Sequence, residues 1–211
     1  MRSNRFPPFA RLAGAIVTAL APLSCGHASV IQVNADCTLD KAIESANFDY
    51  ALLGCVGGSG ADTIEIDDAG TLLIDELPPI VSDIDFVGIG QTPSVITGDG
   101  THRLFFIGDD EHAPTVTFTN LVFNAGVAHG GNSSAGFSAG GGAGAGAGLG
   151  GAIFVFDGAV SVSGSSFTSN SAAGGSSSDY VTLGNFATGS GSGGGGGMFG
   201  AGGAGGDNFN A

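Results

Sequence analysis

The stretch TVTFTNLVFNAG, residues 115–126, decides the fold, because a similar stretch, AVSVSGSSFTSN, occupies residues 159–170. Val116 aligns with Val160, an offset of 44 residues (116 to 160). Apolar residues alternate in each copy, which predicts short strands with one buried face. Similar stretches at a constant offset are typical of proteins built from stacked structural units. We therefore interpret the 44 residues as two units of about 22 residues each.

Upstream of these copies, the chain consists of short runs rich in β-branched and aromatic residues, separated by Gly, Asp, Asn and Pro. No helical pattern interrupts the runs, so alternating βαβ units are not expected. The sequence predicts an all-β solenoid, and a sandwich of amphipathic strands is the alternative. The runs are TIEID (63–67), TLLID (71–75), IVSDIDFVG (80–88), SVITG (94–98) and RLFFIG (103–108).

Glycine is concentrated in the second half of the chain, where 29 of the 41 glycines follow residue 125. Glycine has no side chain to bury and loses the most backbone entropy on ordering. We therefore expect a glycine-rich insertion at 130–151 within a strand-containing region 63–183, and a flexible glycine-rich tail at 184–211.

The stretch CTLDKAIESAN (37–47) is the most helix-like part of the chain. Leu39, Ala42, Ile43 and Ala46 form one apolar stripe, with Thr38 in position to cap the helix. The first unit of a solenoid exposes an apolar end that must be covered. We therefore expect a helix at 38–47 to cap that end, within an N-terminal cap region 29–62.

Residues 1–28 resemble a secretory signal peptide, with cleavage after Ala28. Three arginines and no acid precede the apolar run LAGAIVTALAPL (12–23), and GHAS (26–29) supplies small residues at the junction. The run is shorter than the roughly 20 residues that span a bilayer. We expect an exported protein, extracellular or at the cell surface. A buried hydrophobic helix and a lipoprotein attached through Cys25 are the alternatives.

Cleavage would leave two basic and 19 acidic residues, a net charge of −17 with histidine neutral. Two scattered cations cannot form a nucleic-acid footprint or bind an anionic membrane surface, and no membrane insertion is expected within 29–211. Removal of Cys25 would leave Cys37 and Cys55 as a pair. An even cysteine count in an oxidising compartment predicts a disulfide around the cap helix.

These features together resemble the N-terminal region of secreted bacterial right-handed parallel β-helix proteins of the CSLREA type. The resemblance spans about 31–173 and is carried by CTLDKAIESAN, the second cysteine, GADTIEI (60–66), LPPIVSDIDFVG (77–88), TVTFTNLVF and GGAIFVFDGAVSVSGSSFTSNSA (150–172). It implies a pectin lyase-like fold and an adhesin-like or passenger role, within a longer protein. The family pattern has a basic residue before an acidic one, whereas here Asp40 precedes Lys41, which removes a capping box.

Parallel β-helices also include polysaccharide lyases and glycoside hydrolases, which are the enzymatic alternative. A lyase needs a base and a cation close together, and only Lys41 and Arg103 remain after cleavage. We expect Lys41 on the cap helix and Arg103 paired with Asp99 or another acid. A hydrolase needs two suitably spaced carboxylates, one with a raised pKa, and Asp67 and Asp68 lie in a turn where water would keep them ionised.

Asp109, Asp110 and Glu111 supply further turn carboxylates and are weak candidate ligands for Ca²⁺, because hard oxygens in one turn suit that ion. No EF-hand spacing accompanies them. His102, His112 and His129 lack metal-ligand spacing and are interpreted as turn residues. No catalytic or cofactor-binding residues are predicted. We expect a non-enzymatic segment that binds glycans or host and cell-surface components.

Overall fold

The computed structural model describes residues 28–67, 69–132 and 145–176. Several predicted segments lie outside this part. They are nearly all of the predicted signal peptide, Asp68, residues 133–144 of the predicted insertion and the predicted tail 184–211. One helix and thirteen strands follow one another in it: β1 (Val30–Gln32), α1 (Leu39–Asn47), β2 (Asp62–Ile66), β3 (Thr71–Leu72), β4 (Ile84–Gly88), β5 (Ser94–Thr97), β6 (Phe105–Ile107), β7 (Thr115–Thr119), β8 (Leu121–Asn124), β9 (Val127–His129), β10 (Ile153–Val155), β11 (Ala159–Ser163), β12 (Ser166–Thr168) and β13 (Ser171–Ala173).

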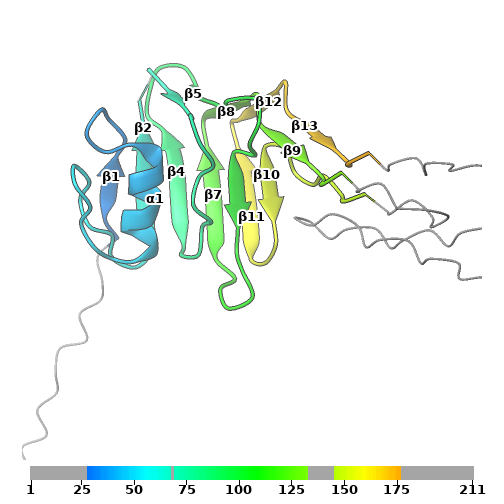
Figure 1. The fold of residues 1–211 in the computed structure, drawn as a ribbon. Coiled ribbons are helices and arrows are strands. Elements are labelled where there is room, and N and C mark those ends of the chain that lie inside the picture. The colour runs from blue at the N-terminus through cyan, green and yellow to red at the C-terminus, as the bar shows by residue number, and fades with distance from the viewer. Residues whose placement is uncertain (1–27, 68, 133–144, 177–211) are drawn as a thin grey trace, which may run out of the picture.

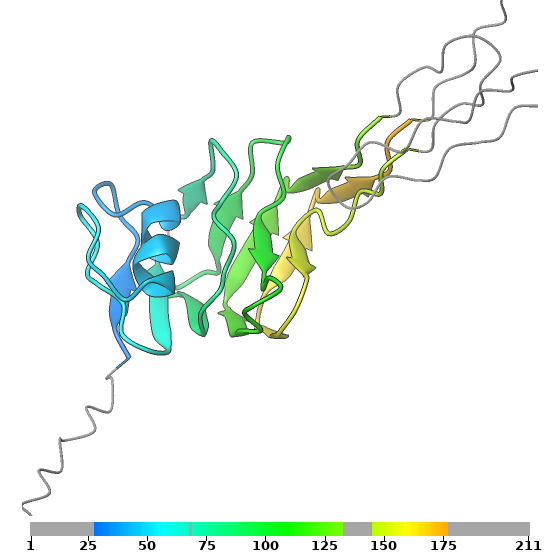
Figure 2. The same cartoon turned by 60° about the horizontal axis from the view of Figure 1, so that its bottom comes forward.

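The strands form four separate parallel sheets. A five-stranded sheet has the order β1-β2-β4-β7-β11, and a four-stranded sheet has the order β12-β8-β5-β3. Two further sheets have two strands each, β10-β6 and β13-β9. Figures 1 and 2 show the strands of the largest sheet side by side, with α1 at the β1 end.

The prediction of a right-handed parallel β-helix is corrected by this topology, because the strands lie in four small separate sheets and not in a solenoid. The spacing between neighbouring strands of the largest sheet gives the physical reason. Successive partners are 33, 22, 32 and 44 residues apart (30 to 63, 62 to 84, 84 to 116 and 116 to 160). A chain that returns after such unequal intervals has no constant structural unit, so its sheets differ in length and strand number.

The two similar stretches nevertheless pair in register. Val116 lies opposite Val160 in β7 and β11, and Phe123 lies opposite Phe167 in β8 and β12. The 44-residue offset is therefore one step between adjacent strands. Our interpretation of that offset as two units of 22 residues is wrong, because β7 and β11 are direct neighbours in the largest sheet.

The core lies between the sheets and is mainly aliphatic, with a cluster of four phenylalanine rings within it. Phe118 packs 5.0 Å from both Phe86 and Phe105 and 5.2 Å from Phe123, measured between ring centroids. All four rings are buried. They occupy inward-facing positions of their strands. In β4 and β7, buried residues alternate with more exposed ones, as the sequence pattern predicts. The apolar face of the strands thus becomes one continuous core.

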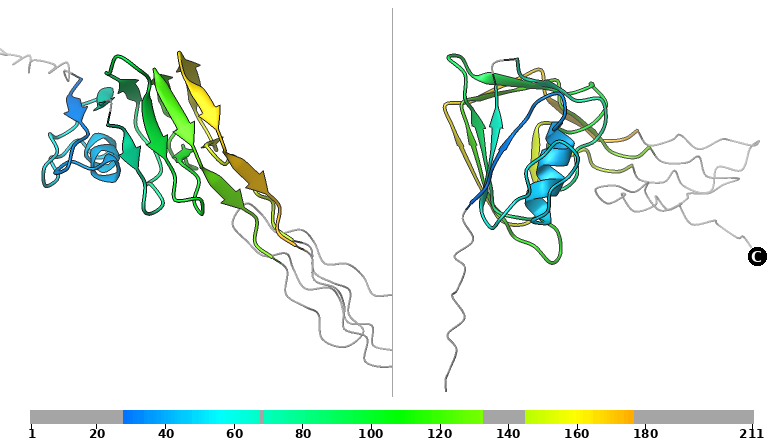
Figure 3. Two further views of the ribbon diagram at one scale, coloured as in Figure 1. Left: turned by 90° about the horizontal axis from the view of Figure 1, so that it is seen from above. Right: turned by 90° about the vertical axis from the view of Figure 1, so that its left-hand side faces the viewer.

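Helix α1 lies at the β1 end of the sheets, as the end-on view in Figure 3 shows. Its buried residues include the whole predicted stripe and also Ser45. Thr38 precedes the helix in an extended conformation, but its side chain makes no capping hydrogen bond. Instead, the Asn34 side-chain oxygen accepts hydrogen bonds from the backbone N–H groups of Asp36 and Cys37 and holds the approach to the helix.

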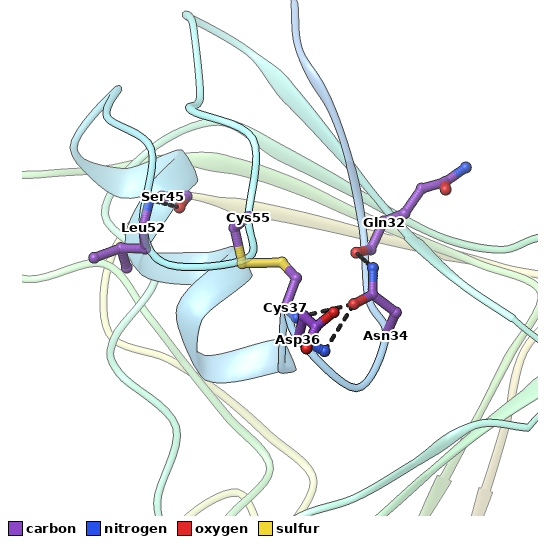
Figure 4. The surroundings of a disulfide bond; sticks show 7 residues. All are labelled: Gln32, Asn34, Asp36, Cys37, Ser45, Leu52 and Cys55. Carbon is purple, nitrogen blue, oxygen red and sulfur yellow. Dashed lines mark hydrogen bonds between the residues drawn. A yellow bond between two sulfur atoms is a disulfide. The ribbon is translucent and has the colours of Figure 1, made fainter.

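The predicted disulfide between Cys37 and Cys55 is confirmed. Both cysteines are buried, and their bond ties the start of α1 to the segment that follows the helix (Figure 4). The Ser45 hydroxyl accepts a hydrogen bond from the backbone N–H of Leu52 within the same loop. The N-terminal region is therefore closed covalently and by local hydrogen bonds.

Candidate functional site

A cleft opens between helix α1 and the segment that begins with β3. Its volume is about 830 Å³, which lies within the range of roughly 300–1,000 Å³ typical of ligand sites. One wall comes from the first turns of α1 and the other from the segment 71–79, with Phe106 also contributing. We refer to this feature as the α1–β3 cleft.

Both walls of the α1–β3 cleft are anchored. On the β3 side, the N–H of Leu73 donates to the carbonyl of Thr97 at 2.8 Å, and the Leu73 and Leu77 side chains are buried in the core. On the helix side, the Asn47 amide donates to the carbonyl of Pro79 at 2.8 Å and accepts from the N–H of Val81 at 3.0 Å. The cleft is therefore held open by the fold itself.

The β3 wall presents a strand edge. β3 is the last strand of its sheet, and within the described part of the chain no strand pairs with its outer side. The Leu73 N–H points toward β5, so the N–H and C=O of Leu72 point away from β5 by strand alternation. Leu72 and Ile74 are 69% and 87% exposed. Such an edge is a template for pairing with another extended chain.

The rim of the α1–β3 cleft is acidic. Asp40 and Glu44 lie on the helix wall, and Asp75 and Glu76 lie on the opposite wall. Among the described residues that line the cleft there is no lysine, arginine or histidine. Four carboxylates around an apolar strand edge favour a ligand with positive charge and apolar groups in alternation.

The structure does not bring the two predicted lyase residues together. Lys41 lies on α1, beside Asn34 and Gly54 in a separate small hollow. Arg103 lies just before β6 and is buried, with its guanidinium carbon 5.6 Å from the ring centre of Phe106 and 5.2 Å from that of Phe154. Burial lowers the pKa of Arg103. The guanidinium thus makes cation–π contacts within the fold, and the negative charge of Glu76 acts on it in the direction that raises its pKa.

The expected pairing of Arg103 with Asp99 is not found, because the Asp99 carboxylate is engaged within its own turn. It accepts hydrogen bonds from the Thr101 hydroxyl at 2.7 Å and binds the His102 ring at 2.7 Å. The hydrogen bond from the Thr101 side chain is the largest cause that lowers the Asp99 pKa. The Asp99 side chain in turn raises the pKa of His102.

The predicted calcium candidates lie in a second turn of the same kind. The Asp109 carboxylate accepts from the N–H groups of Glu111 and His112, and it also binds the His112 ring at 2.8 Å. The backbone hydrogen bond from Glu111 is the main reason that the Asp109 pKa is lowered. Asp110 and Glu111 are exposed.

Within residues 28–67, 69–132 and 145–176, no three His, Cys, Asp or Glu side chains are grouped so that they could hold a metal ion. Asp67 uses its carboxylate to accept from the N–H of Ala69. His102 and His112 lie in turns as expected, whereas His129 ends β9. The Asp-x-x-His pattern at 99–102 and 109–112 was the available sequence signal for both turns.

Sequence reasoning missed the α1–β3 cleft. The available signal was TLLIDELPP (71–79), in which three consecutive apolar residues cannot all lie on one buried strand face. The structure buries Leu73 and leaves its two neighbours exposed. The four acids of the rim were visible in the sequence, but their convergence depends on how α1 packs against the β3 segment.

No protein-family model, curated protein or solved structure matched this chain. Of the helices in the described residues, none combines the length and the apolarity that crossing a bilayer requires.

Proposed function

We propose that this protein is an extracellular, non-enzymatic binding segment with an adhesin-like role, and that the α1–β3 cleft is its ligand surface. The observation that carries the proposal is an acidic cleft beside a strand edge that no strand of the described residues pairs with. Export is supported by the signal-like sequence 1–28, and the Cys37–Cys55 disulfide is a bond typical of oxidising compartments.

The ligand that suits this surface is an extended, cationic segment of another surface protein. Its backbone would pair with the outer edge of β3 and add a strand to that sheet. Its apolar side chains would contact Leu72 and Ile74, and its lysine or arginine side chains would face the four rim carboxylates. Glycans are the other ligand class considered, but no feature of the cleft supplies the backbone-edge complementarity that favours a peptide.

Two of the turn carboxylates are poorly suited to serve as the acid of a glycoside hydrolase. Glycoside hydrolysis needs a carboxylic acid whose pKa is raised by an apolar environment. Hydrogen bonds lower the pKa values of Asp99 and Asp109. Both groups are therefore suited to holding turns and not to donating a proton near neutral pH.

The test is a titration of the full chain with the capped peptide RVKIRV, followed by fluorescence anisotropy. The paired change Asp75→Lys with Glu76→Lys should weaken binding about tenfold, because two attractive charges become repulsive. Asp110→Lys with Glu111→Lys is the matched control, with the same charge change in another exposed turn, and should leave the affinity within about twofold. A peptide N-methylated at alternate amides should not bind, because it cannot pair with β3.

Equal weakening by both pairs of substitutions would show general charge attraction and would reject the cleft as the ligand surface. Binding of a glycan panel in place of the peptide would reject the ligand class but retain the binding function. Release of unsaturated uronates or reducing sugars from pectin or alginate would replace the proposed function with the enzymatic alternative.

A further inference from the structure

Asp62, the first residue of β2, is a buried carboxylate that lies against the start of the described chain. Asp62 is only 1% exposed. One carboxylate oxygen, Oδ1, accepts from the backbone N–H of Ser29 at 2.9 Å and from that of Ser59 at 2.8 Å. The other oxygen, Oδ2, is buried and has no hydrogen-bond partner within the described part of the chain.

The surroundings of Asp62 do not supply a cation. Oδ2 lies beside Gly58, whose N–H donates to the carbonyl of Ser45 in α1. Two nearby acids are engaged elsewhere, since Asp49 accepts from the N–H of Gly60 and Asp83 accepts from the N–H of Thr115. Lys41 of α1 lines the separate hollow beside Asn34 and Gly54. No ion pair with a Lys, Arg or His side chain forms at Asp62 among the described residues. Burying a carboxylate without a cation costs free energy, so a positive charge beside Asp62 would stabilise the fold.

The backbone nitrogen of Ser29 is the atom that can provide this charge. Ser29 follows Ala28, the residue after which we expect signal peptide cleavage. While the Ala28–Ser29 peptide bond is intact, this nitrogen is a neutral amide with one hydrogen. A terminal α-amino group at the same atom has an ordinary pKa of about 7.7–8.0 and, when protonated, three hydrogens to donate.

We propose that Ala28–Ser29 is a processing junction whose new α-ammonium group forms an ion pair with Asp62. A signal-type peptidase would hydrolyse the bond with one water molecule. The C–N bond breaks, the hydroxyl goes to the Ala28 carbonyl to give a carboxylic acid, and the hydrogen goes to Ser29 nitrogen. The resulting amine takes a proton from solvent. The neutral N–H···O contact with Asp62 thereby becomes a charge-assisted one, which is the stronger kind.

The consequence is that processing stabilises the N-terminal region. Ser29 also accepts, through its carbonyl, a hydrogen bond from the N–H of Thr63 at 2.8 Å, so the new terminus is already held in β1–β2 register. The ammonium can reach a carboxylate without moving the strand. The α-amino pKa should rise, so its stabilising effect is fully present below the unfolded value and is lost as the pH rises through the folded value.

The inference rests on the export included in the proposed function, and two measurements separate the two claims. N-terminal sequencing of the exported protein tests processing and should find Ser29 first. Separately, chain 29–211 prepared with a free amine and with an N-acetyl group tests the ion pair. The free-amine chain should melt about 5 °C higher at pH 6, with the difference lost by about pH 10. The α-amino pKa, measured by NMR, should exceed 8.

Asp62→Asn should remove the difference between the free-amine and acetylated chains, whereas Asp110→Asn, a matched loss of one exposed carboxylate, should preserve it. If Asp62→Asn does not fold, the NMR measurement on the unsubstituted chain still decides the question. Equal melting temperatures with an ordinary α-amino pKa would overturn the ion pair, even where sequencing confirms export. A different first residue in the exported protein would overturn the junction.

Discussion

His102 shows how a single exposed side chain makes the stability depend on pH. Its ring binds the Asp99 carboxylate at 2.7 Å, and this contact raises the His102 pKa above its ordinary value of 6.5. The contribution of protonated His102 to stability is therefore fully present below about pH 6.5 and is lost as the pH rises through the raised pKa. The Asp99 pKa is lowered, so its contribution is present above about pH 4 and is lost on acidification.

We predict that His102→Gln lowers the melting temperature by about 1–3 °C near pH 5.5 and by less at pH 8.5. The effect is small because the pair is exposed to water. His129→Gln is the matched control for the loss of one imidazole, because this histidine is exposed at the end of β9. A His102→Gln effect that stays constant from pH 5.5 to 8.5 would contradict the assigned charge pairing.

At the scale of elements, the disulfide compensates for a weakly capped helix. Thr38 makes no side-chain capping bond and α1 has only nine residues, so the isolated helix would be marginal. The Cys37–Cys55 bond spans a sequence separation of 18 residues around it. A loop of that size contributes roughly 3 kcal/mol in the chain-entropy model.

We predict that replacing Cys37 and Cys55 together by alanine lowers the free energy of unfolding by about 3 kcal/mol. Denaturant unfolding followed by far-UV circular dichroism measures the change. When a strong thiol reductant is present throughout, the free energy of unfolding of the unsubstituted chain should fall close to that of the variant. Equal stabilities under oxidising conditions would mean that packing alone holds α1 in place.

At the scale of the whole molecule, the two ends of the sheets differ. α1 lies at the β1 end, while the inward residues of β11 and β12 are partly uncovered within the described part of the chain. Phe123 and Phe167 form a matched pair, because they lie in register with ring centroids 4.7 Å apart. Phe123 is buried, but Phe167 is 51% exposed. The position of the strand within the sheet, and not the residue type, therefore decides how much each ring contributes to stability.

We predict that Phe123→Ala lowers the free energy of unfolding by about 3–5 kcal/mol, because it leaves a cavity among packed rings. Phe167→Ala should cost about 1 kcal/mol, since half of that ring already contacts solvent. Chemical denaturation of both variants tests this difference. Similar losses would indicate that Phe167 is covered in solution by something outside the described residues.

The 44-residue offset continues beyond the strands that revealed it. GGNSS (130–134) and GGSSS (174–178) stand at the same offset in the sequence. The structure pairs their beginnings: the N–H of Gly130 donates to Ala173, and the N–H of Ser176 donates to the Asn132 side chain. The start of each glycine-rich stretch is thus hydrogen-bonded to the other copy just beyond β9 and β13.

The sequence by itself determined the features that depend on local pattern. Alternation placed Ile84 and Phe86 inward, the apolar stripe of 39–46 specified α1, and the two cysteines near it specified the disulfide. Each of these follows from side-chain periodicity or from a short loop, so no knowledge of distant residues was needed. The register of Val116 with Val160 was likewise visible in the sequence. The sequence did not show that the two residues lie on directly neighbouring strands.

Only the tertiary structure decided how the strands associate and where a ligand surface forms. The intervals between neighbouring strands are unequal, so the division into four small sheets could not be read from one repeated offset. The α1–β3 cleft and the contact between Ser29 and Asp62 join residues 27 or more positions apart (44 to 71 in the cleft and 29 to 62 in the contact). Local pattern carries no information about such contacts, because they depend on where the intervening chain returns after each turn.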